Sequence, residues 1–334
     1  MTLKRPPIEL VSLLYVLAYI PYITVTRWLA STVLPGFEHP LKGIEIIPST
    51  LILAGIMLLL FIWLSGWRRA AHQTRVRGLS IPTPTRWTLL SGVGAAVILV
   101  TVPLSYTFKD VSIPFVQLLM RGDILIVAPL VDLIFGRKVR WYSWTALLLT
   151  AAGIAIAVQA RGGLTLPPLC WLVIGLYTLG YFARLAVMSR IAKSGAAGEL
   201  QTYYVEEQIV AVPTAIALMV VLSLMDFGVP GEAIHLGFVG VWTSSALLPL
   251  AGMSAALFAT SVLAATILLD RRENTYCVPL ERSASILAGL AAAYMLSHFG
   301  QPAPTSAELT GAVLLVLAIC ALTWGPRLGR APAK

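Results

Sequence analysis

Long apolar stretches separated by short polar segments dominate the chain. Ten such stretches occur, and most are close to the ~20 residues that a helix needs to cross the hydrocarbon core of a bilayer. They cover residues 8–33, 45–66, 86–107, 112–135, 141–160, 165–189, 200–225, 237–268, 276–298 and 307–325. The pattern predicts an all-α polytopic membrane protein with ten transmembrane helices.

The composition excludes a soluble protein. Of the 334 residues, 58% are hydrophobic and only 12% are charged, whereas soluble domains carry about 25% charged residues. The mean hydropathy of +0.84 agrees with this conclusion. We therefore expect an integral membrane protein, in the bacterial inner membrane, with membrane lipids as its surroundings.

The net charge of +9 follows from membrane topology. If the N-terminus is cytoplasmic, 17 of the 24 Lys and Arg fall in segments on that side. Cytoplasmic loops of membrane proteins carry such an excess of positive charge. The bias predicts that both termini are cytoplasmic and that the number of spans is even. The basic residues form no compact basic face with stacking aromatic residues, so we expect no nucleic-acid partner.

The longest polar connection, Ser65–Arg86, is predicted to be a flexible basic loop and no separate domain. The short segment Arg161–Pro168 divides the ten predicted spans into two sets of five. An odd number of spans in each half forces the second half to insert upside down. We therefore predict two inverted five-helix repeats, residues 1–163 and 164–334, an organisation typical of secondary transporters.

Two units at equivalent places in the halves carry similar marks. The first is IPFVQLL…LVDLIFGRKVRWYSWTALLLTAAGIAIAV, and the second is VPLERSASILAGLAAAYMLSHFGQPAPTSAELTGAVLLVLAICAL. Each has a proline near its start, a long helix, a Phe-Gly exit, a tight turn and a final helix rich in small residues. The alternative is that any two apolar helices look alike, but the shared order and spacing favour a repeat.

These two units resemble the drug/metabolite transporter superfamily, the EamA-like ten-helix permeases related to nucleotide-sugar and triose-phosphate translocators. The resemblance implies a central cavity lined by the first, third, fourth, sixth, eighth and ninth helices. Many relatives carry an acidic residue after the glycine at the exit of the fourth helix. Here Arg137 follows Gly136, and Gln301 follows Gly300 in the second half, so no role for that acid is transferred.

Charged residues inside the fourth span are candidates for the site. Arg121 lies about nine residues, or roughly 13 Å, into this span, close to the bilayer midplane. A charge at that depth costs roughly 2.5–3.5 kcal/mol, so it should meet water, a partner or a substrate. Gln117 shares its helix face, whereas Asp123 points about 200° away. We expect Gln117 and Arg121 to bind substrate, and Asp123 to contact another helix or carry a proton. Alternatively, Arg121 forms a permanent salt bridge that only positions helices.

The ninth span contributes Glu281, Arg282 and Ser285 as further substrate-binding candidates. Related organic-phosphate translocators place a basic pair near this part of the ninth helix. The Glu-Arg pair found here favours a zwitterion, a cation or a lipid headgroup over a multiply charged phosphate. Glu281 is also a candidate for proton coupling.

Further candidates lie on the first, sixth and seventh spans. Arg184 is a candidate substrate contact and Glu207 a candidate proton carrier, although both also fit interfacial residues that pair with each other. Tyr19 and Tyr181 each belong to a tyrosine set with helical spacing. Tyrosine suits a pocket for an amphipathic ligand, but it is also an ordinary anchor at membrane interfaces.

Enzyme signatures are absent from the sequence. It has no Gly-rich phosphate loop, no paired-histidine zinc spacing and no Gly-x-Ser-x-Gly elbow. The three cysteines are too few and too scattered for a metal site or a disulfide framework. We expect no enzymatic activity, no cofactor and no metal.

The sequence favours a secondary transporter that moves a small polar, zwitterionic or amphipathic metabolite by alternating access. Arg121 and Arg282 would contact a negative group, and Asp123 or Glu281 a positive group or a proton. Without a nucleotide site, transport must run on an ion gradient or on exchange. The alternative is a flippase for a lipid or polyprenyl-linked headgroup, which needs a lateral opening between helices. A membrane scaffold or a lipid-modifying enzyme is the least favoured class.

Overall fold

The computed structural model describes residues 7–76, 79–108, 111–122, 141–160, 162–163, 166–191, 198–225, 229–270 and 274–328. Helices dominate these residues, in agreement with the predicted class. They are α1 (Ile8–Leu29), α2 (Gly43–Leu64), α3 (Arg86–Ser105), α4 (Ile113–Arg121), α6 (Trp141–Ala160), α7 (Pro168–Ile191), α8 (Glu199–Leu224), α9 (Val229–Val239), α10 (Leu247–Leu268), α11 (Asn274–Ser297) and α12 (Ser306–Leu328).

Six helices of the described chain are long and apolar enough to cross a membrane: α1, α2, α3, α7, α8 and α10. The helices α6 and α12 contain shorter apolar stretches, Trp144–Ala160 and Ser306–Ala318. Large apolar side chains such as Leu64, Leu148 and Leu248 are 70–86% exposed on the outside of the helices. An exterior of this kind is stable in hydrocarbon, so the chain is an integral membrane protein.

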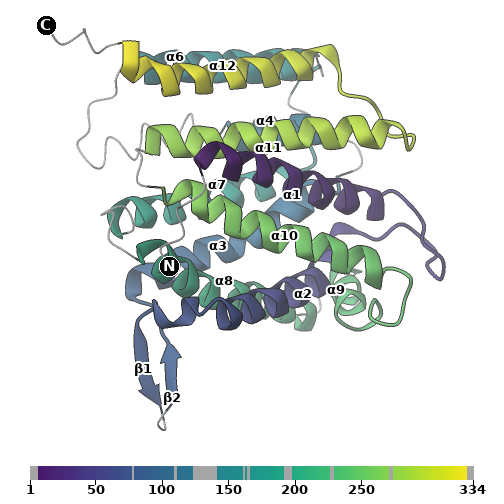
Figure 1. Ribbon diagram of the computed structural model, residues 1–334. Coiled ribbons are helices and arrows are strands. Elements are labelled where there is room, and N and C mark those ends of the chain that lie inside the picture. Colours follow the sequence, from purple (N-terminus) through teal and green to yellow (C-terminus); the bar gives the residue numbers. More distant parts are fainter. Residues whose placement is uncertain are drawn as a thin grey trace, which may run out of the picture.

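The helices pack in layers, with α6 and α12 side by side as an outer pair (Figure 1). Next to this pair lie α4 and α11, which contact each other and also contact α6 and α12. Deeper in the bundle, α1 packs against α10 and α11, and α3 packs against α7 and α8. The helices α4 and α11 therefore lie between the outer pair and the rest of the bundle.

Glycines allow the closest of these contacts. A Cβ atom added to Gly180 on α7 would lie 2.7 Å from the carbonyl oxygen of Gly94 on α3, and the reverse distance is the same. Gly153 on α6 and Gly311 on α12 face each other in a similar way, at 3.0 Å. Small residues let membrane helices approach until their backbones touch, which strengthens van der Waals packing.

The predicted span 237–268 is wrong at its start. The chain forms α9 up to Val239, then a series of turns, and α10 begins only at Leu247. In the turns, the Ser244 hydroxyl donates to the carbonyl of Val241 at 2.8 Å, and the Ser245 hydroxyl donates to that of Pro35 at 2.7 Å. Hydroxyl groups that bond to nearby backbone compete with helix formation. The prediction from hydropathy did not take these hydrogen bonds into account.

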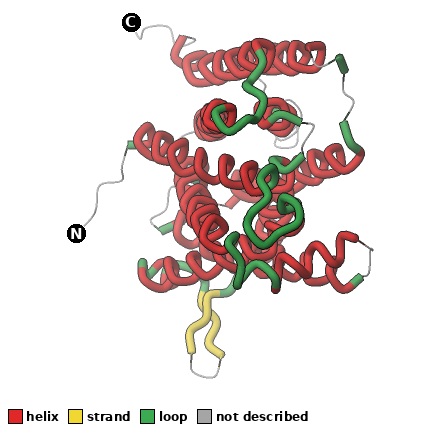
Figure 2. The backbone as a smooth tube through the Cα atoms, turned by 90° about the vertical axis from the view of Figure 1, so that its right-hand side faces the viewer, coloured by secondary structure: helices red, strands yellow, loops and turns green. Residues whose placement is uncertain are grey.

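The loop Ser65–Arg86 has more structure than predicted. It contains a short 3-10 helix, Trp67–Arg69, and an antiparallel hairpin of β1 (Gln73–Val76) and β2 (Leu79–Pro82). Figure 2 shows the hairpin projecting away from the helices. Its base is attached to α8, because the backbone N–H of His72 donates to Glu206 Oε1 at 3.0 Å and that of Thr85 donates to Glu206 Oε2 at 3.4 Å.

The contact between α3 and α7 can be tested by substituting its glycines. Gly180→Ala should lower the free energy of unfolding by about 1–3 kcal/mol, because the new methyl group meets the backbone of Gly94. Gly175→Ala on the same helix is the matched control, since a Cβ there meets nothing within 4 Å. Thermal unfolding of the purified variants in detergent measures both effects, and equal midpoints for the two variants would contradict the close contact.

Candidate functional site

Polar side chains from α1, α4, α7 and α11, with Tyr106 at the end of α3, meet in the interior of the bundle. Each is at most 5% exposed. We call this set the buried polar cluster; it consists of Tyr15, Tyr19, Tyr22, Tyr106, Gln117, Arg121, Tyr177, Tyr181, Glu281 and Arg282. Charges buried this deeply in a membrane protein are costly and are therefore usually functional.

Two guanidinium groups converge on one phenol at the centre of the cluster. Arg121 Nη1 and Arg282 Nη1 both donate to the hydroxyl of Tyr177. Arg121 Nη2 also donates to the hydroxyl of Tyr19 at 3.3 Å. The guanidinium carbon of Arg282 lies 3.7 Å from the ring centroid of Tyr181, a cation–π contact. Within the described residues, tyrosine side chains thus contact both cations.

Glu281 is the carboxylate of the buried polar cluster. Its Oε1 accepts a hydrogen bond from the Tyr15 hydroxyl at 2.7 Å. Its Oε2 lies 3.8 Å from Nε of Arg282, which is longer than a hydrogen bond, and has no hydrogen-bond partner among the described residues. Glu281 is therefore held by Tyr15 and lies beside Arg282 without a direct hydrogen bond to it.

A layer around Gln117 covers the cations on the side where α4 begins. Gln117 Nε2 donates to the Tyr106 hydroxyl at 3.1 Å, and that hydroxyl is 2.8 Å from the Tyr19 hydroxyl. The Gln117 amide rests against Gly289 of α11, where an added Cβ would overlap it. Gln117 Oε1 has no hydrogen-bond partner in the described part of the chain. Gln117 and Arg121 share one face of α4, as predicted from their spacing.

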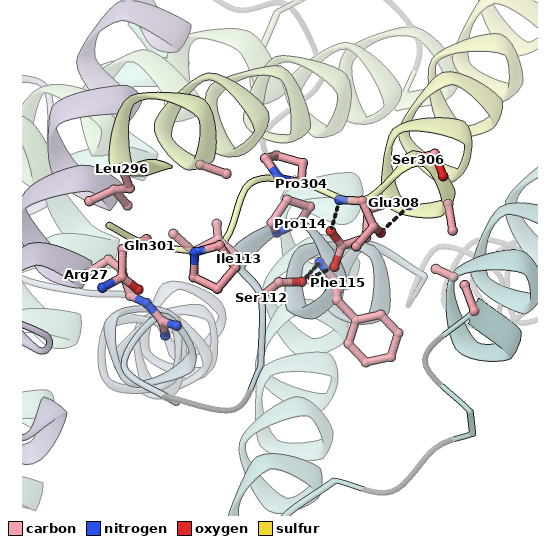
Figure 3. A pocket seen from close by; sticks show the side chains of 16 residues that line it. Arg27, Ser112, Ile113, Pro114, Phe115, Leu296, Gln301, Pro304, Ser306 and Glu308 are labelled. Atoms are coloured by element: carbon pink, nitrogen blue, oxygen red, sulfur yellow. Dashed lines mark hydrogen bonds between the residues drawn. The ribbon is translucent and has the colours of Figure 1, made fainter. Parts of the chain in front are cut away.

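A cavity of about 590 Å³ lies among the ends of α1, α4, α6, α11 and α12. Figure 3 shows Arg27 on one side of this cavity and Glu308 on the other. Arg27 Nη1 donates to the carbonyls of Tyr106, at 3.2 Å, and Phe108, at 2.5 Å. Glu308 accepts from the Ser112 hydroxyl. The volume falls within the usual range for small-molecule sites, roughly 300–1,000 Å³.

The cavity adjoins the Gln117 layer. Residues 112–115 of the α4 start line it, and Gln117 follows within one turn. On α11, Ala293 lines the cavity, and Gly289 lies one helical turn, about 5.4 Å, deeper. Tyr106 joins the two regions, because its carbonyl accepts from Arg27 and its hydroxyl from Gln117. One layer of side chains therefore separates the cavity from the buried cations.

Arg184 and Glu207 form a separate ion pair between α7 and α8. Arg184 Nε and Nη2 each donate to one carboxylate oxygen of Glu207, both at 2.8 Å. Glu207 Oε1 also accepts from the hydroxyls of Ser91, at 2.7 Å, and Tyr203, at 2.9 Å. Because the two charges satisfy each other, this arrangement fits the alternative in which Arg184 and Glu207 pair with one another.

Most of the residues predicted from the sequence to bind substrate lie in one place. Six of the candidates, Gln117, Arg121, Glu281, Arg282, Tyr19 and Tyr181, lie together in the buried polar cluster. The buried Ser285 hydroxyl donates to the carbonyl of Arg282 at 2.7 Å, within its own helix. Asp123 lies outside the described residues.

Sequence reasoning gave too little weight to Tyr177, Arg27 and Glu308. Tyr177 lies one helical turn before Tyr181 in the sequence, but only the fold shows that two arginines bind its hydroxyl. Arg27 lies near the end of the first predicted span, where a positive charge is ordinary and gives no signal of a site. Glu308 lies at the start of a predicted span, and its spacing gave no signal of a cavity. Among the described residues, no group of three His, Cys, Asp or Glu side chains is placed to hold a metal ion.

Comparison with known proteins supports the fold alone. No protein-family model matches the chain, and no curated protein matches it significantly. A solved structure named only "Crystal structure of protein" matches with a TM-score of 0.54 and 13% sequence identity. The match covers 96% of this chain and 99% of the other. The chain thus shares its overall architecture with a known structure over nearly its whole length.

The Arg184–Glu207 pair predicts a large loss of stability when one partner is removed. Glu207→Gln should lower the free energy of unfolding by about 3–5 kcal/mol, because it leaves the Arg184 guanidinium buried without its counter-charge. Glu232→Gln on α9 is the control, since Glu232 is exposed. Thermal unfolding in detergent measures the difference. If both variants unfold at the same temperature, Arg184 has found another partner and the pair does not stabilise the fold.

Proposed function

We propose that the protein is a secondary transporter that moves a small polar, zwitterionic or amphipathic metabolite by alternating access. The observation that carries the proposal is the pair Arg121 and Arg282, buried one layer of side chains below a cavity of solute size. Cations at this depth cost roughly 2.5–3.5 kcal/mol each on insertion scales. A site that takes up a solute gives a reason to keep them.

The helix contacts support a pair of inverted halves. In this proposal α1, α2, α3, α4 and α6 belong to the first half, and α7, α8, α10, α11 and α12 are their equivalents. The contact of α1 with α10 then corresponds to that of α7 with α3, and the contact of α2 with α10 corresponds to that of α8 with α3. Equivalent helices also meet directly, as α6 with α12 and α4 with α11. This is the pattern that a two-fold axis in the membrane plane produces.

The proposed topology places both termini in the cytoplasm of a bacterial cell and the cavity beside Arg27 on the opposite side of the inner membrane. The Gln117 layer then closes the path from this cavity to Arg121. In one state of the cycle this layer must open while the end of the bundle near the hairpin stays closed. In the other state the layer must close and that end of the bundle must open. Because no nucleotide site was found in the sequence, an ion gradient or exchange of a second solute would drive the cycle.

Alternating access predicts how cysteines react along the path. In a variant without Cys170, Cys277 and Cys320, Ala293→Cys in the cavity should react with a membrane-impermeant maleimide from the outside. Ser285→Cys lies below the Gln117 layer and should react slowly from either side, because each orientation exposes it in turn. Labelling of right-side-out and inside-out vesicles measures both rates.

The exposed residue Glu38, changed to Cys in the same background, provides the control for a position that always reacts. If Ser285→Cys stays unreactive from both sides while Glu38→Cys and Ala293→Cys react, the buried polar cluster is sealed permanently. The transport proposal would then fail.

A flippase would behave differently, and a lipid assay separates the two functions. Because the buried polar cluster is enclosed by helices, with each member at most 5% exposed, a carrier should leave lipid movement unchanged. Proteoliposomes with a fluorescent phosphatidylglycerol should lose about half of their signal to external dithionite, as protein-free vesicles do. Loss of nearly the whole signal, abolished by Arg121→Gln, would favour headgroup transport instead.

A further inference from the structure

Two arginines and a tryptophan meet at one end of the α3–α7 pair, away from the buried polar cluster. Arg86 is the first residue of α3, Trp87 follows it, and Arg190 lies in the last turn of α7. The guanidinium carbon of Arg190 lies 4.3 Å from the centroid of the Trp87 ring, and that of Arg86 lies 5.2 Å from it. Two cations from different helices therefore share one indole. We call these three residues the arginine–tryptophan site.

The two guanidinium groups keep their hydrogen-bond donors for a ligand. Both arginines are exposed, and within the described residues neither forms an ion pair or donates a hydrogen bond. The cation–π contacts with Trp87 hold them through the face of the ring, which takes up no acceptor. The carboxylate of the neighbouring Glu206 is engaged by the backbone N–H groups of His72 and Thr85. The site thus presents two cations with free donors.

Apolar side chains continue along the helix faces that begin at these arginines. On α3, Leu90 and Val93 follow Arg86 by four and seven residues, and both are exposed. On α7, the exposed Leu179 precedes Arg190 by eleven residues, or about three turns. These spacings place each set on one face of its helix. Acyl chains cover such a face in a membrane, so the arginines lie where the lipid headgroups begin.

An anionic phospholipid matches both parts of this surface. The planar guanidinium is suited to bind phosphate oxygens with two parallel charge-assisted hydrogen bonds. Tryptophan is enriched at the level of the headgroups, and anionic lipids attract basic residues at the cytoplasmic surface. A zwitterionic phospholipid fits less well, because its ammonium group brings a further positive charge to two arginines.

We propose that Arg86, Trp87 and Arg190 bind one anionic phospholipid of the phosphatidylglycerol type. Its phosphate lies between the two guanidiniums and joins α3 to α7, and its acyl chains lie along Leu90 and Leu179. Only binding and release are involved, with no covalent step. The site is separate from the buried polar cluster, so the proposal does not depend on transport.

The test measures lipid binding to the delipidated full chain in a neutral detergent by native mass spectrometry. Dioleoyl phosphatidylglycerol should bind more tightly than dioleoyl phosphatidylcholine, which has the same acyl chains. Arg86→Gln and Arg190→Gln should each weaken binding of the first phosphatidylglycerol about fivefold, the usual effect of one basic residue at an anionic lipid surface. Equal affinity for the two lipids would overturn the proposal.

Arg75→Gln is the matched control. Arg75 is exposed on the hairpin, which projects away from the helices (Figure 2), and its substitution removes the same charge. Binding should stay unchanged in this variant. If all three variants lose affinity equally, the attraction belongs to the whole basic surface and the site is refuted. Thermal unfolding without lipid confirms that each variant is folded. Arg190→Lys adds a second readout, since it keeps the charge, loses the planar fork and should still weaken binding.

Two further measurements separate one bridging lipid from other occupants. The double variant Arg86→Gln/Arg190→Gln should weaken binding by less than the product of the single effects, because both arginines contact the same phosphate. Effects that multiply fully would mean two independent lipids and would overturn the bridge. Glycerophosphoglycerol, the same headgroup without acyl chains, should neither compete with the lipid nor raise the unfolding temperature. If it does both as well as phosphatidylglycerol, the ligand is a soluble phosphate and the lipid proposal fails.

Discussion

Two guanidinium groups that share one phenolic oxygen in the interior of a membrane bundle constrain most of what surrounds them. Arg121 and Arg282 come from α4 and α11, and Tyr177 comes from α7, so three helices must keep their relative depth for the contact to exist. Tyrosine rings are suited to this environment, because they are apolar enough for the interior and still offer a hydroxyl and a π face to a cation. The arrangement keeps two charged side chains buried deep in the bundle, and charges at such depth are usually functional.

Buried charged residues occur in two different environments, the Arg184–Glu207 pair and the buried polar cluster. At Arg184–Glu207, two parallel hydrogen bonds at 2.8 Å and two further hydroxyl donors satisfy the carboxylate. Such a pair joins α7 to α8, and its carboxylate is fully engaged by donors of the protein itself. In the buried polar cluster, atoms of four residues lack hydrogen bonds within the described residues: the Tyr22 hydroxyl, Gln117 Oε1, Arg121 Nε and Glu281 Oε2. Unmade hydrogen bonds at buried atoms cost free energy, and they mark the cluster as the part of the interior that is suited to a ligand.

The sequence predicted the helical class and the face shared by Gln117 and Arg121, because a 3.6-residue period fixes which side chains lie together on one helix. It also selected most of the cluster, since an ionised residue inside an apolar span stands out whatever the fold. It could not show that Tyr177 joins Arg121 to Arg282, because that depends on the depth at which three separate helices pack. The break before Leu247 and the hairpin after His72 were missed for a related reason. Both depend on local hydrogen bonds of serine, threonine and histidine that hydropathy does not measure.

Two kinds of helix contact occur in the bundle: close backbone contacts at glycines, and hydrogen-bonded contacts between polar side chains. The α3–α7 and α6–α12 pairs meet backbone to backbone at glycines, and such close-packed surfaces resist sliding because any shift produces overlap. Between α4 and α11 the outer contact is of another kind: the Gln117 amide lies on Gly289 and bonds to Tyr106, which in turn bonds to Tyr19. An amide and two hydroxyls readily exchange partners, since each donates and accepts. A solute that draws Arg121 away from Tyr19 would free that hydroxyl, and through Tyr106 would weaken the hydrogen bonding of Gln117. In the proposed carrier, binding of a solute at Arg121 and release of the Gln117 layer would then become one event, which is the coupling between binding and access that alternating access requires.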